Sequence, residues 1–160
     1  MGFGPGAVCG IHLNSTLTAA EQARYQDTAV IQRLLGESRT VAIVGLSADR
    51  QKASSFVASY LRSEGYRIVP VNPHESQVLG EQCYPDLDSV PGPVDIVDIF
   101  RRSEFVPEIV EAAIRKGAKV VWMQEGVIHD DAARRAEAAG LTVVMDRCIL
   151  KDHRRLAYAS

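Results

Sequence analysis

The sequence of 160 residues contains few cysteines and no CxxC pair. Cys9, Cys83 and Cys148 lie too far apart along the chain to predict a disulfide scaffold, and none has a histidine at the spacing of zinc ligands. The four histidines are also isolated from one another. The sequence therefore predicts no metal site, and a reducing cytoplasm is the expected compartment.

The sequence also lacks an excess of charge of one sign and any long apolar run. Eighteen Lys and Arg residues against twenty Asp and Glu residues leave a net charge of −2. A nucleic-acid-binding protein presents a positive field that such a chain does not have. No apolar run reaches the roughly 18 residues that cross a bilayer, and residues 1–13 do not resemble a signal peptide. We expect a flexible leader over 1–17 and one domain over 18–160, with neither nucleic acid nor a membrane as partner.

What the sequence does contain is an alternation of short apolar runs with amphipathic segments. The runs are continuous, which is typical of parallel strands buried on both faces; they cover 41–44, 68–71, 94–100, 119–123 and 141–145. Helical spacing, with a glycine after each segment, predicts helices over 54–63, 105–116 and 130–139. The capping-box spacing of Thr18 and Glu21 predicts an earlier helix. The pattern predicts an α/β class, doubly wound Rossmann-like fold with a five-stranded parallel sheet in the order 3-2-1-4-5.

Ligands of such folds bind at the carboxyl ends of the strands, near the point where the strand order reverses, here between the first and fourth strands. The first run ends in Gly45, Leu46 and Ser47. A glycine allows close backbone approach, and free amides at a helix start, together with the hydroxyls of Ser47, Ser54 and Ser55, suit a phosphate. No GxGxxG, GxxxxGK[ST] or GxSxG motif is present. An ordinary strand-to-helix turn therefore remains an equally good interpretation.

The third run ends in Phe100, Arg101 and Arg102. Guanidinium groups match phosphate oxygens, and with Lys52 the two arginines form a basic cluster on a slightly acidic chain. A solvated arginine pair before the next helix is the alternative. The second run ends in Asn72 and Pro73 without the acidic residue that an NAD site places there. That end is therefore either a nucleotide contact or a simple turn.

The last two strand ends add candidates of other chemistry. Gln124 and the backbone of Gly126 follow the fourth run, and Cys148 follows the fifth. Arg147 beside this cysteine would favour its thiolate. A small buried apolar residue is the usual alternative for a free cysteine, and no catalytic partner for Cys148 is recognisable. We therefore assign no catalytic residue.

In order along the chain, five motifs resemble the small stand-alone CoA-binding protein family. That family is similar to the CoA-binding domain of the succinyl-CoA synthetase alpha subunit. The motifs are VAIVGLS at 41–47, YRIVPVNP at 66–73, VDIVDIFRRS at 94–103, VWMQ at 121–124 with Gly126, and VMDRC at 144–148. The resemblance covers roughly residues 28 to 158 and implies a Rossmann-like fold that binds coenzyme A or an acyl-CoA.

The resemblance also implies where the ligand lies. It places Gly45, Ser47, Lys52 and Ser55 on a first phosphate loop, and it places further contacts at Asn72, Pro73, Phe100, Arg101, Arg102, Gln124 and Gly126. The helix start would hold the pyrophosphate, the basic cluster would meet the 3′-phosphate, and Cys148 would lie near the thiol. No histidine is expected to take the role of the synthetase's phosphohistidine.

The length leaves little room for a second domain, so a CoA-binding protein without catalysis of its own is the favoured function. An NAD(P)-dependent oxidoreductase is one alternative. A CoA-binding subunit of an acyl-CoA ligase, acting with a separate ATP-grasp partner, is another. Whether the chain forms a homodimer is open.

Overall fold

The structure is a computed structural model and describes residues 16–157. Most of the predicted leader, with Cys9, lies outside the described residues. Five parallel strands form one sheet in the spatial order β2-β1-β5-β6-β7. They are β1 (Thr40–Val44), β2 (Arg67–Val71), β5 (Ile96–Ile99), β6 (Val120–Met123) and β7 (Thr142–Val144). Each falls within or next to a predicted apolar run, so the five-stranded parallel sheet and its Rossmann-like class are confirmed.

One detail of the predicted order needs correction. The run at 94–100 was expected beyond the second strand, but β5 lies beside β1, with Val44 opposite Ile99. The position beyond β2 belongs to Tyr84, which forms one parallel bridge with Val71. Its N–H donates to Pro70 O at 3.0 Å. Counting this bridge restores the order 3-2-1-4-5, with β7 as a sixth position. The sequence hid the segment because a single bridge requires no apolar run.

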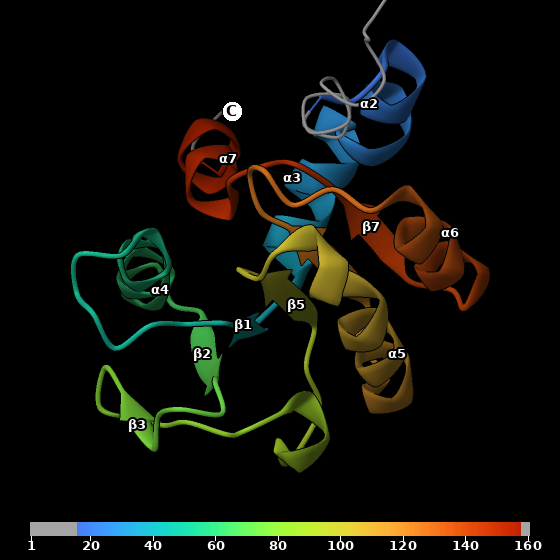
Figure 1. Ribbon diagram of the computed structural model, residues 1–160. Coiled ribbons are helices and arrows are strands. Elements are labelled where there is room, and N and C mark those ends of the chain that lie inside the picture. Colours follow the sequence, from blue (N-terminus) through green and yellow to red (C-terminus); the bar gives the residue numbers. More distant parts are fainter. Residues whose placement is uncertain (1–15, 158–160) are drawn as a thin grey trace, which may run out of the picture.

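Helices cover both faces of the sheet (Figure 1). On one side lie α5 (Val106–Lys116) and α6 (Asp130–Ala138), and on the other lie α3 (Thr28–Glu37), α4 (Ala53–Ser63) and α7 (Ile149–Leu156). Alternate strand residues divide the buried apolar side chains into two clusters, one under each helical layer. Among residues 16–157, no helix has the length and apolar character needed to cross a membrane.

The N-terminal helical region is two helices rather than one. The predicted capping box of Thr18 and Glu21 is present at the start of α2 (Ala19–Tyr25). Asp27 interrupts the helix and caps α3 instead, since its carboxylate accepts the N–H of Val30 at 3.0 Å. The Pro-rich link over 73–93 contains one short helical turn, η1 (Leu87–Ser89). It also contains a small antiparallel hairpin of β3 (Gln77–Val78) and β4 (Glu81–Gln82) that the sequence did not predict.

Candidate functional site

The turn after β1 packs directly on the end of β5. Gly45 has φ +91°, and its N–H donates to Val71 O at 2.8 Å. A Cβ at this position would lie 2.5 Å from Phe100 O and 3.0 Å from Arg101 Cδ. Only glycine allows both the backbone conformation and this approach. The strand order reverses between β1 and β5. The loops that follow these two strands meet at residues predicted for the site. The fourth strand, named earlier as the other side of the switch, is one position further along the sheet.

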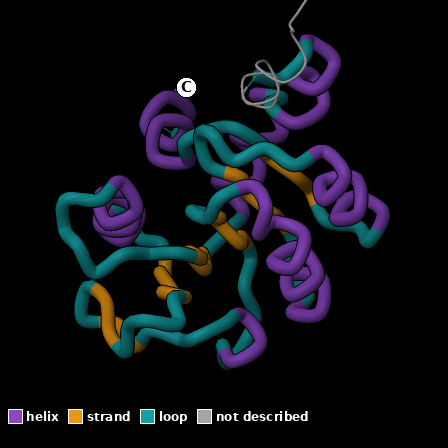
Figure 2. Tube along the Cα trace, viewed as in Figure 1, coloured by secondary structure: helices purple, strands orange, loops and turns teal. Residues whose placement is uncertain are grey.

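The loop from Gly45 to Lys52 is held by its own polar groups. The N–H of Ser47 donates to Ser54 Oγ at 3.1 Å, and Ser47 Oγ accepts the N–H of Asp49 at 3.0 Å. Lys52 is the N-cap of α4 but makes no side-chain cap, and its side chain is exposed. Figure 2 shows this loop running outward from β1 to α4. Its geometry leaves a charged lysine beside a helix start.

The predicted phosphate-loop residues differ in their accessibility. Ser54 and Ser55 are 5% and 1% exposed, and Leu46 is completely buried in the core. Of the predicted residues here, Ser47 is half-buried and Lys52 is exposed, as are the side chains of residues 48–51 between them. A ligand at this loop would therefore meet backbone amides and these two side chains more readily than the hydroxyls of the first helical turn.

Asn72 ties the turn after β2 to the turn after β1. Its Nδ2 donates to Leu46 O at 3.0 Å, and its Oδ1 accepts the N–H of His74 at 2.8 Å. The side chain thus performs the turn-forming role that the sequence left open, and it also joins two loops of the candidate site. Pro73 follows at the surface.

A cavity of about 410 Å³ lies between β1, β2, η1 and α5, beside the Gly45 turn. Its apolar wall consists of Val44, Val71, Pro73, Pro85, Leu87, Ile109 and Ala112. Arg101 also lines it, and the guanidinium of Arg101 lies 4.2 Å from the centre of the Phe105 ring. Arg102 approaches the same ring at 5.4 Å. Both arginines therefore lie near the Phe105 ring, and Arg101 also lines the cavity.

Acidic residues line the far wall of this cavity, and two of them are neutralised by arginines. The carboxylate of Asp88 lies 2.9 Å from Arg115, and that of Glu111 lies 2.8 Å from Arg135. A hydrogen bond from the arginine lowers the pKa of each carboxyl. These pairs reduce the negative charge that a phosphorylated ligand would meet.

The ends of β6 and β7 meet at the start of α7. Gln124 is 5% exposed, and its Oε1 accepts the N–H of Ile149 at 3.1 Å. The N–H of Gly126 donates to Asp146 Oδ1 at 2.7 Å. Cys148 is a half-buried free thiol at the N-cap of α7. Three predicted residues therefore do come together here, although Gln124 is partly engaged as a helix cap.

Residues that the sequence analysis missed also lie near these elements. One is Asp152, which is 1% exposed and forms ion pairs with both Arg147 and Arg155. Asp98, near the end of β5, is completely buried, and neither carboxylate oxygen has a hydrogen-bond partner. Burial raises the pKa of Asp98 far above the usual range. The signal for this residue was an acidic side chain inside an apolar run.

The described residues contain no group of three or more His, Cys, Asp or Glu side chains that could hold a metal ion. The predicted residues fall instead into three neighbouring parts of the carboxyl edge of the sheet. These are the Gly45 turn with Asn72, the arginine pair beside the apolar cavity, and the Gln124–Cys148 region. The parts offer backbone amides, cations, an apolar wall and a thiol, which suit a phosphorylated ligand with an aromatic base.

Comparisons with known proteins identify the family of this chain. The CoA binding domain family matches residues 39–154. The Bacillus subtilis (strain 168) protein YneT is 38% identical over 125 residues, which are 78% of this chain and 93% of YneT. A hypothetical protein from Pyrococcus horikoshii OT3 has a solved structure with a TM-score of 0.79 at 38% identity, covering 81% of this chain and 92% of that one.

Larger enzymes contain a related region. The ADP-forming acetate–CoA ligase II of Archaeoglobus fulgidus is 26% identical over 126 residues, which are 78% of this chain but 19% of the ligase. The chain therefore spans about a fifth of that ligase. The resemblance stated from the sequence is confirmed: the chain belongs to the CoA binding domain family, whose members include small proteins and regions of acetate–CoA ligases.

Proposed function

We propose that this protein binds coenzyme A or an acyl-CoA at the carboxyl edge of the sheet, between β1 and β5. The observation that carries the proposal is the Gly45 turn, where a Cβ would lie 2.5 Å from Phe100 O. This approach brings the β1 loop, which leads to the start of α4, against the end of β5, which Arg101 and Arg102 follow. A diphosphate linked to a flat aromatic base requires that combination of amides, cations and apolar surface.

Each part of coenzyme A has a proposed location. The pyrophosphate lies against the backbone of Gly45 and Ser47, with Lys52 beside it. The adenine enters the cavity of about 410 Å³. Arg101 and Arg102 meet the 3′-phosphate at the mouth of that cavity. The pantetheine arm runs toward Gln124, Gly126 and Cys148. Binding without catalysis is proposed, because no nucleophile paired with a general base was found among the predicted residues.

Isothermal titration calorimetry with coenzyme A and 3′-dephospho-CoA tests this function. We expect the wild-type protein to bind coenzyme A more tightly, and the difference to shrink at high salt because the 3′-phosphate contact is ionic. The double variant Arg101→Gln/Arg102→Gln should bind the two ligands equally. Arg134→Gln is a matched control, since Arg134 pairs with Asp130 on the surface of α6. Failure of the wild-type protein to bind coenzyme A would remove the proposal.

A second candidate is a CoA-binding subunit that acts with an ATP-grasp partner. It is favoured by the similarity between this chain and part of an ADP-forming acetate–CoA ligase. Under this proposal, ADP-forming ligase activity would appear only when the partner is added. For the NAD(P)-dependent alternative, Asn72 stands where an acidic residue would hold the ribose of NAD, which disfavours NAD but not NADP, and the absence of a GxGxxG motif disfavours both. Thermal shifts with NAD and NADP, compared with coenzyme A, distinguish it.

A further inference from the structure

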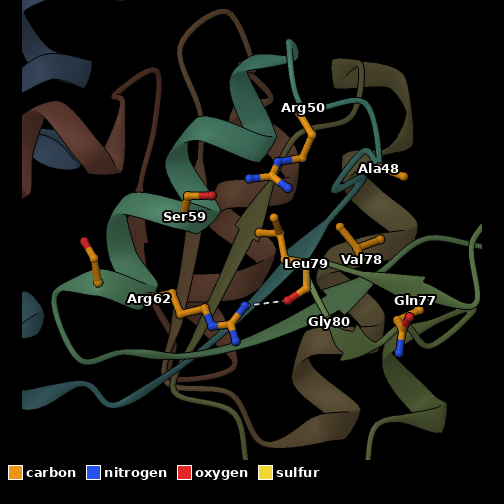
Figure 3. A pocket seen from close by; sticks show the side chains of 9 residues that line it. Ala48, Arg50, Ser59, Arg62, Gln77, Val78, Leu79 and Gly80 are labelled. Atoms are coloured by element: carbon orange, nitrogen blue, oxygen red, sulfur yellow. Dashed lines mark hydrogen bonds between the residues drawn. The ribbon is translucent and has the colours of Figure 1, made fainter.

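A second cavity, of about 790 Å³, lies on the outer side of α4 and is separate from the cavity beside Arg101. It is bounded by the loop after β1, by α4 and by the β3–β4 hairpin (Figure 3). Its lining residues are Ala48, Arg50, Ser59, Arg62, Ser63, Gln77, Val78, Leu79 and Gly80. Two are arginines and none carries a carboxylate. The cavity beside Arg101, in contrast, is lined by four acidic residues.

The two guanidinium groups reach the same space from opposite ends of the cavity. In Figure 3, Arg50 extends from the loop toward α4, and Arg62 extends from the last turn of α4 toward the hairpin. The hydroxyl of Ser59 points toward the Arg50 guanidinium. Arg62 donates to Leu79 O and lies 3.5 Å from a carboxylate oxygen of Glu81. Arg62 is therefore held in place by the hairpin.

Arg50, in contrast, has no hydrogen bond or ion pair within residues 16–157. Arg50 lines the cavity together with Ser59 and Gln77. The guanidinium geometry matches the oxygens of a phosphate group. Arg50 can therefore bind an anion without first breaking a contact, and Arg62, which the hairpin holds in place, adds a second positive charge to the same cavity.

The hairpin that closes the cavity is built in an unfavourable backbone conformation. Leu79 has φ +54° and Gly80 has φ +77°. A left-handed leucine costs roughly 1–2 kcal/mol, so the surrounding structure must hold it. The bond from Arg62 to Leu79 O supplies one such contact, and the Leu79 side chain packs against the buried cluster under α4.

We infer that this cavity is a binding site for a phosphate monoester, with Arg50 and Arg62 as its cationic ligands. The inference goes beyond the proposed function, which assigns the 3′-phosphate of coenzyme A to Arg101 and Arg102. Two sources of the group share this chemistry. One is a free phosphorylated small molecule that binds beside coenzyme A. The other is the 3′-phosphate of coenzyme A itself, because Arg50 belongs to the loop that follows Gly45.

The first experiment measures phosphate binding without coenzyme A. Glycerol 2-phosphate is titrated at constant ionic strength and followed by ³¹P NMR and calorimetry. We expect Arg50→Gln to weaken binding about tenfold, the usual effect of losing a hydrogen bond to a charged group. Arg67→Gln removes the same charge from an exposed residue of β2 that does not line the cavity, and it should leave binding unchanged. Arg62→Gln is a second variant, and thermal melting checks that each variant folds.

The second experiment identifies the source of the phosphate. The same titration is repeated with saturating coenzyme A and with saturating 3′-dephospho-CoA. Retained binding with both ligands supports a free phosphorylated molecule, and blockage by coenzyme A alone supports the 3′-phosphate. Equal binding by the wild-type protein, Arg50→Gln and Arg62→Gln overturns the inference, as does an equal loss in Arg67→Gln. The first experiment does not involve coenzyme A, so failure of coenzyme A to bind would affect only the proposed function.

Discussion

The buried carboxyl of Asp98 makes stability depend on pH in a direction opposite to that of most acidic residues. Both of its oxygens are buried without a hydrogen bond, and burial raises its pKa. The carboxyl therefore keeps its proton in the folded protein over a pH range in which the unfolded chain, with a pKa near 3.9, has released it. The folded state then binds one more proton, so the free energy of unfolding falls as pH rises.

The magnitude follows from proton linkage. Each pH unit in which the folded carboxyl stays protonated and the unfolded one is ionised removes about 1.4 kcal/mol of stability. Asp98→Asn replaces the carboxyl with a neutral group of nearly the same size that does not titrate. The variant should therefore gain about 1.4 kcal/mol per pH unit relative to the wild-type protein, beginning above pH 5.

Urea unfolding followed by fluorescence measures this difference, because Trp122 is the one tryptophan and is completely buried. Asp95→Asn, immediately before the same strand, is a control. Burial would raise the pKa of Asp95, but the N–H groups of Thr40 and Arg39 lower it overall. Asp95 is thus ionised in both states above pH 5, and its variant should differ from the wild-type protein by a constant. If the Asp98→Asn curve also runs parallel to the wild-type curve, the folded carboxyl is ionised and the reasoning fails.

Three further predictions concern the candidate site and its support. Gly45→Ala should destabilise the fold and abolish binding of coenzyme A. The control Gly92→Ala, at φ +78° in open space, should cost only the roughly 1–3 kcal/mol of backbone strain. Urea unfolding measures the stability of both variants, and calorimetry measures their binding of coenzyme A. Burial lowers the pKa of His153 despite an opposing effect of Glu64. The wild-type protein should therefore lose stability relative to His153→Gln as pH falls below about 6.5. A difference in unfolding free energy between the two proteins that does not change with pH would contradict this. Oxidised coenzyme A (the disulfide) should form a mixed disulfide with Cys148 and release one CoA thiol; an unchanged adduct in Cys148→Ser by intact mass spectrometry would exclude that cysteine.

The sequence predicted the sheet better than it predicted α7. Buried parallel strands are visible in the sequence because most of their positions are apolar. Helix α7 is hidden because its buried side includes Asp152 and His153, which are 1% and 6% exposed. Arg147 and Arg155 neutralise the first, and Tyr60 hydrogen-bonds the second at 2.8 Å. A pattern based on hydropathy assigns such residues to solvent, and only their tertiary partners reverse the assignment.

The candidate site shows the same division between local and tertiary information. Gly45 and the β5-end arginines could be predicted because each directly follows a recognisable strand. Arg50 and Arg62 could not be predicted in this way, because Arg50 lies on a loop and Arg62 lies in the last turn of α4. They share a cavity only after the hairpin folds against α4. Residues that face one another across elements leave no periodic signal in the sequence.

The location of the cleft was nevertheless insensitive to the error in strand order. The chain leaves β1 toward β2 and returns on the other side of β1 as β5, whichever segment fills the position beyond β2. The two loops that diverge from this point are those after β1 and β5, and loops that diverge leave a crevice between them. Gly45 lies on one of these loops and Arg101 on the other, and a Cβ at Gly45 would lie 3.0 Å from Arg101 Cδ. A parallel sheet therefore defines where a ligand can bind through the reversal of its winding, and the chemistry of the residues beside that reversal decides which ligand it is.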